Sequence, residues 1–396
     1  METNEAYIVS SVRTPVGKAN RGALRHVRPE ELGALAVTEA MGRVEGLEPE
    51  MIDDVLMGCA FPEGPQGMNM GRIIAQKAGL PDSVPGATVN RFCSSGLQTI
   101  AMASQSIMAG YTDVAVAGGA ESMSQVPMSG FHFQPDPDLT EGDPDVYVSM
   151  GITAENVAEE YDVSREEQDR FALQSHERAT DAIDSGRFEE ETVPVEVEEM
   201  SMNGRREPEQ VQHTLDTDEG PRRDTSLEVL AKLPPAFKKG GTVTPGNASQ
   251  RSDGAAATVV MSEDRVDELG VEPMARLRGF ALHGVAPEVM GIGPIGAIEK
   301  VLGQTGLSKD DIGLVELNEA FAAQSLAVIR ETGFDEEIVN VNGGAIALGH
   351  PLGCTGAKLT ATLLHEMRRR GVRFGLCTMC VGGGMGAAGV IENLDA

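Results

Sequence analysis

The stretch TVNRFCSSGLQTIAMASQSIM, residues 88–108, decides how this chain is organised. Ala87 and Val89 predict a short buried strand, Cys93 follows at a turn, and an apolar helix is predicted from Ser94 onward. The free N–H groups and the dipole at a helix start favour a thiolate over a thiol, so we expect a reactive cysteine. The alternative is an inert, buried structural cysteine. The helix prediction rests on small or apolar residues at three-to-four spacing: Leu97, Ile100, Ala101, Ser104, Ile107 and Met108.

The composition of the 396 residues predicts an α/β protein of two or three domains, with 41% hydrophobic residues and 47 glycines. The formal net charge is −29, aromatic residues are only 4%, and Trp is absent. Such a surface repels phosphate backbones and anionic membranes, so we expect neither nucleic acid nor a membrane as partner. The acidic runs at 189–191 and 196–199, with few lysines, favour a halophilic source over an ordinary acidic cytosolic protein.

The first residues and the cysteines predict a cytoplasmic protein. Residues 1–5 are polar and acidic, without the apolar segment of a signal peptide. No stretch approaches the ~20 apolar residues of a membrane span. The five cysteines are an odd number, spread from Cys59 to Cys380, which is typical of reduced thiols rather than of a disulfide framework.

Strands and helices alternate along the first 122 residues. We expect strands at 6–10, 54–58 and 114–117, and helices at 30–43 and 72–78. This alternation predicts a mostly parallel sheet that helices cover on both faces.

The composition then changes, and residues 123–244 are rich in Pro, Asp and Glu. We interpret this segment as an inserted, loop-rich lid with two helices. One is expected from about Thr153, and the other from Ser164, which forms a capping box with Glu167. Excursions of this kind from an α/β core usually carry binding residues.

After the insertion, the second half of the chain weakly repeats the first. A buried strand is predicted at 255–261, and the α/β pattern resumes after about residue 271. A predicted strand at 339–343 contains Asn342, as Asn90 follows the strand before Cys93, and a helix follows each. Two copies of one α/β unit are therefore expected, packed so that their corresponding turns meet.

Two turns of the second half hold further candidate groups. His350 precedes a predicted helix at 355–370 and could accept a proton from a thiol, or it could be a loop histidine bonded to backbone. Cys380 ends a predicted strand at 374–380, before a glycine-rich turn whose N–H groups could bind an oxyanion. If the two copies pack turn to turn, Cys93 lies near both.

Two further patterns have simpler interpretations. Cys377 and Cys380 form a C-x-x-C, but on a strand and without a second pair at metal spacing, so redox chemistry and a metal site are disfavoured. Asn318 and Glu319 follow a predicted strand at 313–315, where Asn318 could cap a helix.

Together these motifs resemble the thiolase family over nearly the whole chain. The resemblance implies a five-layered αβαβα fold of two similar α/β halves, residues 1–122 plus 245–270 and residues 271–396, with residues 123–244 inserted as a loop domain. The matching motifs are VNRFCSSGLQ at 89–98, GGAESMS at 118–124, GTVTPGNAS at 241–249, NEAFA at 318–322, NVNGGAIALGHPLGCTGA at 340–357 and CVGGGMGAA at 380–388.

The resemblance also implies catalytic roles. Cys93 is expected to be the acylated nucleophile, His350 its base, and Cys380 the acid/base for the substrate α-carbon or the CoA sulfur. His350 with a water held by Asn318 resembles a first oxyanion hole. The N–H groups of Cys93 and Gly382 resemble a second.

The substrates implied are acyl-CoA, acetyl-CoA and CoA, with no bound cofactor and no metal, in a homodimer or homotetramer. Ser149 stands where acetoacetyl-CoA biosynthetic thiolases carry His, so acyl groups longer than acetyl and a degradative 3-ketoacyl-CoA thiolase are favoured. The residues expected along the substrate path are Arg222, Phe237, Ser249, Met150, Met290, Ala320 and Phe321.

Three alternatives remain beside this interpretation. The first is a biosynthetic thiolase specific for acetoacetyl-CoA. The second is a decarboxylating ketoacyl synthase, which pairs its cysteine with two histidines or with His and Asn, and Cys380 argues against it. The third is a non-catalytic CoA- or lipid-binding homologue, which would lack the nucleophile or the histidine, whereas Cys93 and His350 are both present.

Overall fold

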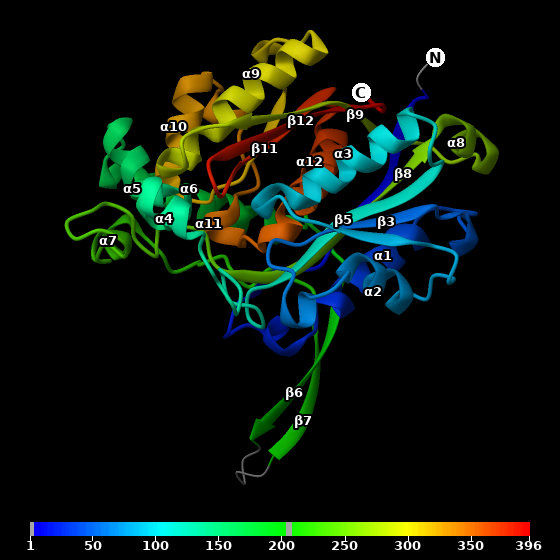
Figure 1. Ribbon diagram of the computed structural model, residues 1–396, viewed down its shortest axis with the longest axis horizontal. Coiled ribbons are helices and arrows are strands. Elements are labelled where there is room, and N and C mark those ends of the chain that lie inside the picture. Colours follow the sequence, from blue (N-terminus) through cyan, green and yellow to red (C-terminus); the bar gives the residue numbers. More distant parts are fainter. Residues whose placement is uncertain (1–3, 203–207) are drawn as a thin grey trace.

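The computed structural model describes residues 4–202 and 208–396, and its centre is one continuous path of paired strands (Figure 1). The strand order is β10-β11-β12-β9-β1-β8-β5-β3-β4, and the short β2 (Gly17–Lys18) pairs with β8. The strands are β1 (Ala6–Arg13), β3 (Asp54–Gly58), β4 (Gly86–Val89), β5 (Val114–Ser122), β8 (Ser252–Ser262), β9 (Ala275–Gly284), β10 (Leu314–Leu317), β11 (Phe374–Val381) and β12 (Met385–Asn393).

The path consists of two similar sets of strands. β4-β3-β5-β8-β1 forms one set and β10-β11-β12-β9 the other, joined where β1 pairs with β9 at Tyr7–Arg276 and Ile8–Ala275. The outer pairs β3–β4, β3–β5 and β10–β11 are parallel, but the inner pairs are antiparallel. The prediction of a mostly parallel sheet is therefore wrong for the inner strands. Between β11 and β12 only three residues turn the chain, too few for a parallel crossover.

Helices complete the five layers that the resemblance implied. α1 (Pro29–Gly42) and α2 (Met70–Lys77) cover the outer face of the first set, and α9 (Gly293–Thr305) and α10 (Ala322–Thr332) cover that of the second (Figure 1). Between the two sets lie α3 (Ser95–Met108) and α12 (Leu352–Arg370). The order is thus helices, sheet, helices, sheet, helices, which confirms the predicted αβαβα fold.

The two central helices touch backbone to backbone near their N-termini. A Cβ atom on Gly96 of α3 would lie 2.5 Å from the amide nitrogen of Ala357, and one on Gly356 of α12 would lie 2.2 Å from that of Leu97. The contact is reciprocal, as expected for two copies of one unit related by an approximate twofold rotation. Because the helix starts meet here, the turns that precede them also meet.

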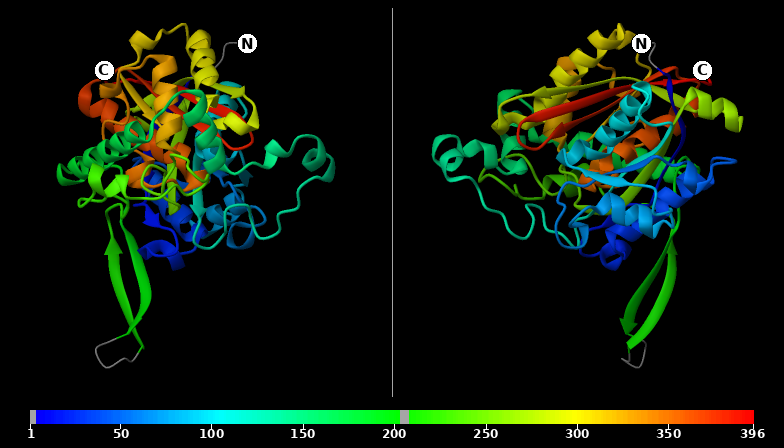
Figure 2. Two further views of the ribbon diagram at one scale, coloured as in Figure 1. Left: turned by 90° about the vertical axis from the view of Figure 1, so that its left-hand side faces the viewer. Right: turned by 45° about the vertical axis from the view of Figure 1, so that its right-hand side comes forward.

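The segment between β5 and β8 contains more regular structure than the predicted loop-rich lid. Ser164 caps α6 (Arg165–Asp184) with the predicted capping box to Glu167. The hairpin of β6 (Val195–Met202) and β7 (Pro208–Leu215), which the sequence did not indicate, projects from the body of the molecule (Figure 2). The helices here are α4 (Pro137–Gly142), α5 (Met150–Glu160), α6 (Arg165–Asp184) and α7 (Leu227–Ala231).

A buried ion-pair cluster fastens this segment to the core. Arg13, at the end of β1, donates from Nε to Glu191 at 2.5 Å and from its two terminal nitrogens to Asp218 at 2.8 and 2.9 Å. All three side chains are buried, and the two carboxylates raise the pKa of the guanidinium against the effect of burial. Because a buried charge without its partner is costly, this cluster holds the two ends of the β6–β7 hairpin against the end of β1.

Two strand predictions differ from the structure in detail. The expected strand at 339–343 is wrong: only Val339 pairs, in a single parallel bridge to Val315. Asn340 turns the chain with φ +47°, and its side chain instead bonds the backbone N–H and C=O of Leu317. β4 is a half-exposed edge strand rather than a buried one.

Short helices make up the rest of the regular structure. Within the described residues, no helix combines the length and apolar character needed to cross a bilayer. The remaining helices are α8 (Glu263–Leu269), α11 (Ala345–Leu348) and the 3-10 helices η1 (Ala23–His26), η2 (Pro49–Met51), η3 (Gly64–Gln66), η4 (Phe92–Ser94), η5 (Pro144–Tyr147), η6 (Pro287–Ile292), η7 (Lys309–Asp311) and η8 (Glu336–Ile338).

Candidate active site

Short polar side chains hold the turn that carries Cys93. Phe92 has φ +42°, a conformation that a bulky residue rarely adopts. The Oδ1 atom of Asn90 accepts from the amide of Phe92 at 2.8 Å, and Ser95 Oγ accepts from the amide of Arg91 at 2.9 Å. Ser95 also donates to the carbonyl of Phe92 at 2.7 Å. Local hydrogen bonds therefore stabilise a strained turn immediately before the cysteine.

The environment of Cys93 opposes the predicted thiolate. Desolvation of the sulfur raises the pKa of Cys93 to about 12, although hydrogen bonds from the backbone N–H groups of Gly382 and of Cys93 itself lower it. The negative charge of Glu121 raises it further. The expectation of a lowered pKa is therefore wrong, because desolvation outweighs the effect of the helix start. At neutral pH the resting group is the thiol.

His350 is held through both ring nitrogens by side chains. Nδ1 lies 2.6 Å from Thr355 Oγ1, and Nε2 lies 3.3 Å from Asn318 Nδ2. The backbone N–H of His350 donates to the carbonyl of Gln250 and to Ser252 Oγ, each at 3.1 Å. Burial and the nearby Lys358 lower the pKa of His350 to about 3. The imidazole is therefore neutral at physiological pH and can accept a proton.

Asn318 lies beyond the end of β10, with its backbone N–H bonded to the carbonyl of Thr378 at 2.9 Å. It does not cap a helix, because α10 begins at Ala322 and its N-cap is Phe321. Its Oδ1 atom is buried and has no hydrogen-bond partner in the described part of the chain. The helix-cap interpretation is therefore wrong, and the amide contacts His350 instead.

Cys380 and Gly382 come from β11 and the turn that follows it. Cys380 is buried, and its pKa is raised first by desolvation and then by the neighbouring Cys93. The backbone N–H of Gly382 bonds the sulfur of Cys93. Cys377 lies three residues earlier on the same strand, so it faces the other side of the sheet, and both cysteines are free thiols.

Cys93 and His350 line one cavity of about 530 Å³. Asn318, Cys380 and Gly382 are not part of its lining, but each lies against a residue that is. Sequence reasoning missed Met123, Met128, Gln250, Arg251 and Leu352 on its wall, which only the fold brings together. The lining includes every residue predicted along the substrate path: Arg222, Phe237, Ser249, Met150, Met290, Ala320 and Phe321.

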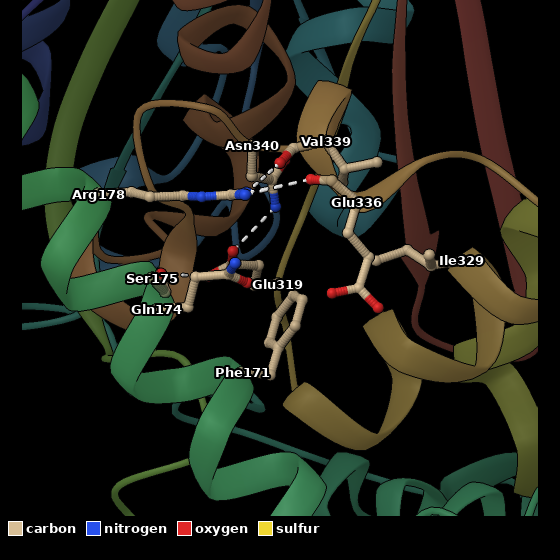
Figure 3. Close-up of a pocket in the computed structure, with 9 residues that line it drawn as sticks. All are labelled: Phe171, Gln174, Ser175, Arg178, Glu319, Ile329, Glu336, Val339 and Asn340. Atoms are coloured by element: carbon tan, nitrogen blue, oxygen red, sulfur yellow. Dashed lines mark hydrogen bonds between the residues drawn. The ribbon is translucent and has the colours of Figure 1, made fainter. Parts of the chain in front are cut away.

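The loop that carries His350 is anchored on one side by Glu319. Its carboxylate accepts from Ser175 Oγ at 2.6 Å, from Asn340 Nδ2 at 2.9 Å and from the amide of Ile346 at 3.2 Å. Beside it, Arg178 of α6 donates to the carbonyl of Val339 at 2.7 Å, as Figure 3 shows. Burial raises the pKa of Glu319, while these hydrogen bonds lower it.

Glu121 anchors the other side of the same loop. This buried carboxylate at the end of β5 accepts from the backbone N–H of Gly353 at 2.8 Å and from that of Ala60 at 2.7 Å. Glu121 and Glu319 both belong to motifs that the sequence singled out, but only the fold shows that they hold one loop. Among residues 4–202 and 208–396, no three His, Cys, Asp or Glu side chains are grouped as metal ligands.

Comparisons with known proteins agree with this geometry. The family models for Thiolase, N-terminal domain, and Thiolase, C-terminal domain, match residues 6–264 and 271–393. A 3-ketoacyl-CoA thiolase of Bacillus subtilis (strain 168) is 57% identical over 388 residues, covering 98% of this chain and 99% of the relative. An acetyl-CoA acetyltransferase of Syntrophomonas wolfei is 46% identical over 408 residues, covering 99% and 100%.

Two solved structures are similar over the whole fold. The Bacillus anthracis acetyl-CoA acetyltransferase matches with a TM-score of 0.90 at 43% identity, covering 99% of this chain and 100% of that one. The human mitochondrial 3-ketoacyl-CoA thiolase matches with a TM-score of 0.89 at 40% identity, covering 100% of both chains.

Proposed function

The chain belongs to the thiolase family, and from this premise we propose that it is an acetyl-CoA C-acyltransferase. It cleaves 3-ketoacyl-CoA with CoA, or condenses acetyl-CoA with an acyl-CoA in the reverse direction, through an acyl group carried on Cys93. One observation supports this above the others: turns from both halves bring Cys93, His350 and Cys380 together at one apolar cavity.

In this proposal, acylation starts from the uncharged thiol of Cys93 and the uncharged imidazole of His350. As the sulfur of Cys93 bonds to the thioester carbonyl carbon, His350 Nε2 takes the thiol proton. The N–H groups of Cys93 and Gly382, which already bond the sulfur, are close enough to stabilise the carbonyl oxygen as it becomes negative. The carbon–sulfur bond to CoA then breaks, and the proton on His350 passes to the CoA sulfur.

The carbon–carbon step uses the second cysteine. In condensation, the thiol proton of Cys380 first passes to His350 Nε2, and the resulting Cys380 thiolate removes a proton from the α-carbon of acetyl-CoA. The carbanion attacks the acyl group on Cys93, whose sulfur leaves and takes back the proton from His350. His350 and a water held by Asn318 stabilise the enolate oxygen. Thiolysis runs the same steps backwards, with Cys380 returning the proton to the α-carbon.

The cavity wall supports acyl groups longer than acetyl. Met123, Met128, Met150 and Met290 give it flexible apolar side chains that adapt to different chain lengths, and Ser149 adds little bulk. We therefore favour a degradative 3-ketoacyl-CoA thiolase over an enzyme specific for acetoacetyl-CoA. Thiolysis rates across 3-ketoacyl-CoA substrates of increasing length test this, and activity confined to acetoacetyl-CoA would overturn it.

We also propose a homodimer or homotetramer in the cytoplasm. The five unpaired cysteines agree with a reducing compartment, and light scattering coupled to size-exclusion chromatography measures the assembly.

The direct test of the function is acyl transfer to Cys93. Incubation with labelled acetyl-CoA is expected to add one acetyl group to the peptide that contains Cys93. Cys93→Ser is expected to abolish the label and to slow turnover at least about 1,000-fold. Cys354→Ser, which changes a buried cysteine of α12 outside the cavity, is the matched control and should keep the label. An acetyl group found on Cys380 instead would reverse the proposed roles.

A further inference from the structure

Thr355 makes the shortest contact with the imidazole of His350. It lies in the first turn of α12 and is buried. Its Oγ1 is 2.6 Å from His350 Nδ1 and 3.0 Å from the carbonyl oxygen of Pro351, to which the hydroxyl donates. A hydroxyl has a single proton, so once it is given to Pro351 the oxygen can only accept from Nδ1. Nδ1 must then carry the hydrogen.

The other ring nitrogen contacts an amide side chain. Nε2 of His350 faces the Nδ2 amide group of Asn318 at 3.3 Å, which can only donate. A donor on that side requires a lone pair on Nε2. The Thr355 contact makes the assignment, and the Asn318 contact is compatible with it.

We infer that Thr355 is a positioning residue that holds His350 in the Nδ1–H tautomer, so that Nε2 is the nitrogen that takes the proton of Cys93. This inference rests on the proposed role of His350 as the base. Thr355 accepts from Nδ1–H before the proton transfer and still does so when the ring becomes an imidazolium. The contact therefore stabilises the charged ring without any rearrangement.

The other charged groups around the ring do not supply this function. Lys358 of α12 lowers the pKa of His350 and therefore opposes the imidazolium. Arg222 and Arg251 line the same cavity as Cys93 and are cations. Glu121 and Glu319 bind backbone N–H groups on either side of the loop rather than the ring. Thr355 is thus the side chain placed to fix which nitrogen is basic.

The tautomer has a kinetic signature in the pH profile of Cys93 acylation. With the pKa of His350 near 3 and that of Cys93 near 12, proton transfer within the neutral pair gives a rate that is flat from pH 6 to 9. Without a working base, only the small thiolate fraction reacts, and that fraction rises about tenfold per pH unit. A merely structural role for Thr355 would leave the flat profile intact.

The experiment measures acylation of Cys93 by acetyl-CoA, and kcat and KM for acetoacetyl-CoA thiolysis, in four variants of the full chain. Thr355→Val removes the hydroxyl at nearly constant volume, and Thr355→Ser restores it. Thr360→Val is the matched control, because Thr360 is equally buried in α12 and makes the same bond to the carbonyl four residues earlier, at 2.8 Å. His350→Ala reports on the base itself.

Thr355→Val is expected to lower kcat about 10- to 100-fold with KM within about twofold, and to give a profile that rises with pH. Thr355→Ser and Thr360→Val should keep the flat profile. A flat profile in Thr355→Val beside a rising one in His350→Ala would overturn the inference alone. A flat profile in both would overturn the role of His350 and the inference with it. If Thr355→Val does not fold, judged by circular dichroism, Thr355→Ala carries the same predictions.

Discussion

The central helices α3 and α12 make reciprocal contacts, but the turns that lead into them differ in length. Gly96 comes six positions after Asn90, whereas Gly356 comes fourteen positions after Asn342. The additional residues of the second turn form the loop that carries His350. One structural unit, used twice, thus provides a nucleophile at a short turn and a base on a longer one.

The two turns are also held in different ways. The Cys93 turn is held by Asn90 and Ser95, both within three residues of the cysteine. The ring and backbone of His350 are held by side chains such as Asn318 and Ser252, far away in the sequence. The position of the nucleophile is therefore a local property of the chain, while that of the base depends on the whole fold.

The largest effects on rate should come from substitutions that remove one catalytic group at a time, His350 or Cys380. His350→Ala is expected to slow acylation of Cys93 about 100- to 10,000-fold, because the thiol loses its base. Cys380→Ser should leave acylation nearly intact but slow the carbon–carbon step by a similar factor, because a serine hydroxyl is a far weaker acid. Rapid-quench measurement of the acyl-enzyme, set against steady-state turnover, separates the steps. An equal acylation burst in wild type and His350→Ala would contradict the role of His350 as the base for acylation.

The next change breaks the contact that the two halves share. In Gly356→Ala the new Cβ would lie 2.2 Å from the backbone of Leu97, so the two helices must move apart. Overpacking of this kind costs about 1–3 kcal/mol or more, and both the melting temperature and turnover should fall. Gly303→Ala is the control, because its Cβ in α9 meets nothing within 4 Å. That variant should melt at or slightly above the wild-type temperature.

A smaller effect is expected in the inserted segment, where one buried histidine makes stability depend on pH. His176 of α6 accepts the backbone N–H of Arg222 on Nδ1 at 3.1 Å, and burial followed by the charges of Arg222 and Lys18 lowers its pKa to about 4. Unfolding returns this pKa to about 6.5, so the unfolded chain binds the proton more readily. Stability from this group is complete above pH 6.5 and is lost as the pH falls towards 4.

His176→Asn keeps an acceptor for Arg222 but cannot titrate. Its melting temperature should therefore fall less than that of the wild type between pH 7.5 and 5, by a few degrees. His350 shifts the pH dependence in the same direction, and the buried carboxylates Glu121 and Glu319, whose pKa values are raised, in the opposite one. All three are unchanged in the variant, so the difference isolates His176. His132→Asn, at an exposed histidine of the same segment, is the control, and parallel curves for His176→Asn and wild type would contradict the assignment.

Residue patterns located many single strands and helices because short-range physics decides these, whereas the five-layered arrangement was implied by the family resemblance. The stretch around Cys93, the capping box at Ser164 and the strand at 54–58 all appear where periodicity and capping placed them. The antiparallel inner strands and the β6–β7 hairpin were not predictable in this way. Their pairing depends on which segments meet after collapse, and strand periodicity is the same for parallel and antiparallel partners.

The properties of the site were likewise predictable only where they depend on neighbouring residues in the sequence. The lining of the cavity agreed with the residues that the family resemblance implied, but the protonation state of Cys93 did not follow from the helix start. A local argument counts the N–H groups near the sulfur and omits the desolvation produced by the other half of the molecule. The roles of Thr355, Glu121 and Glu319 were missed for a related reason. Their side chains act through contacts that exist only once α12 and the His350 loop are in place.

The inserted segment also differs from the two halves in its net charge. The smallest expected effect is therefore a dependence of stability on salt. Residues 123–244 contain 28 Asp and Glu but only 11 Lys and Arg, so this segment carries more than half of the net charge of −29. The Debye length is about 30 Å at 0.01 M salt and about 3 Å at 1 M, so repulsion within the segment is strong only in dilute buffer. Raising KCl from about 0.05 to 3 M should raise the melting temperature by several degrees and stabilise assembly. Hydrogen exchange should slow mainly in α4 to α7, while the strands of both halves change little. A uniform change across all layers would show that the salt acts on the whole fold, and no change at all would remove the halophilic interpretation while leaving the chemistry of Cys93 and His350 as it stands.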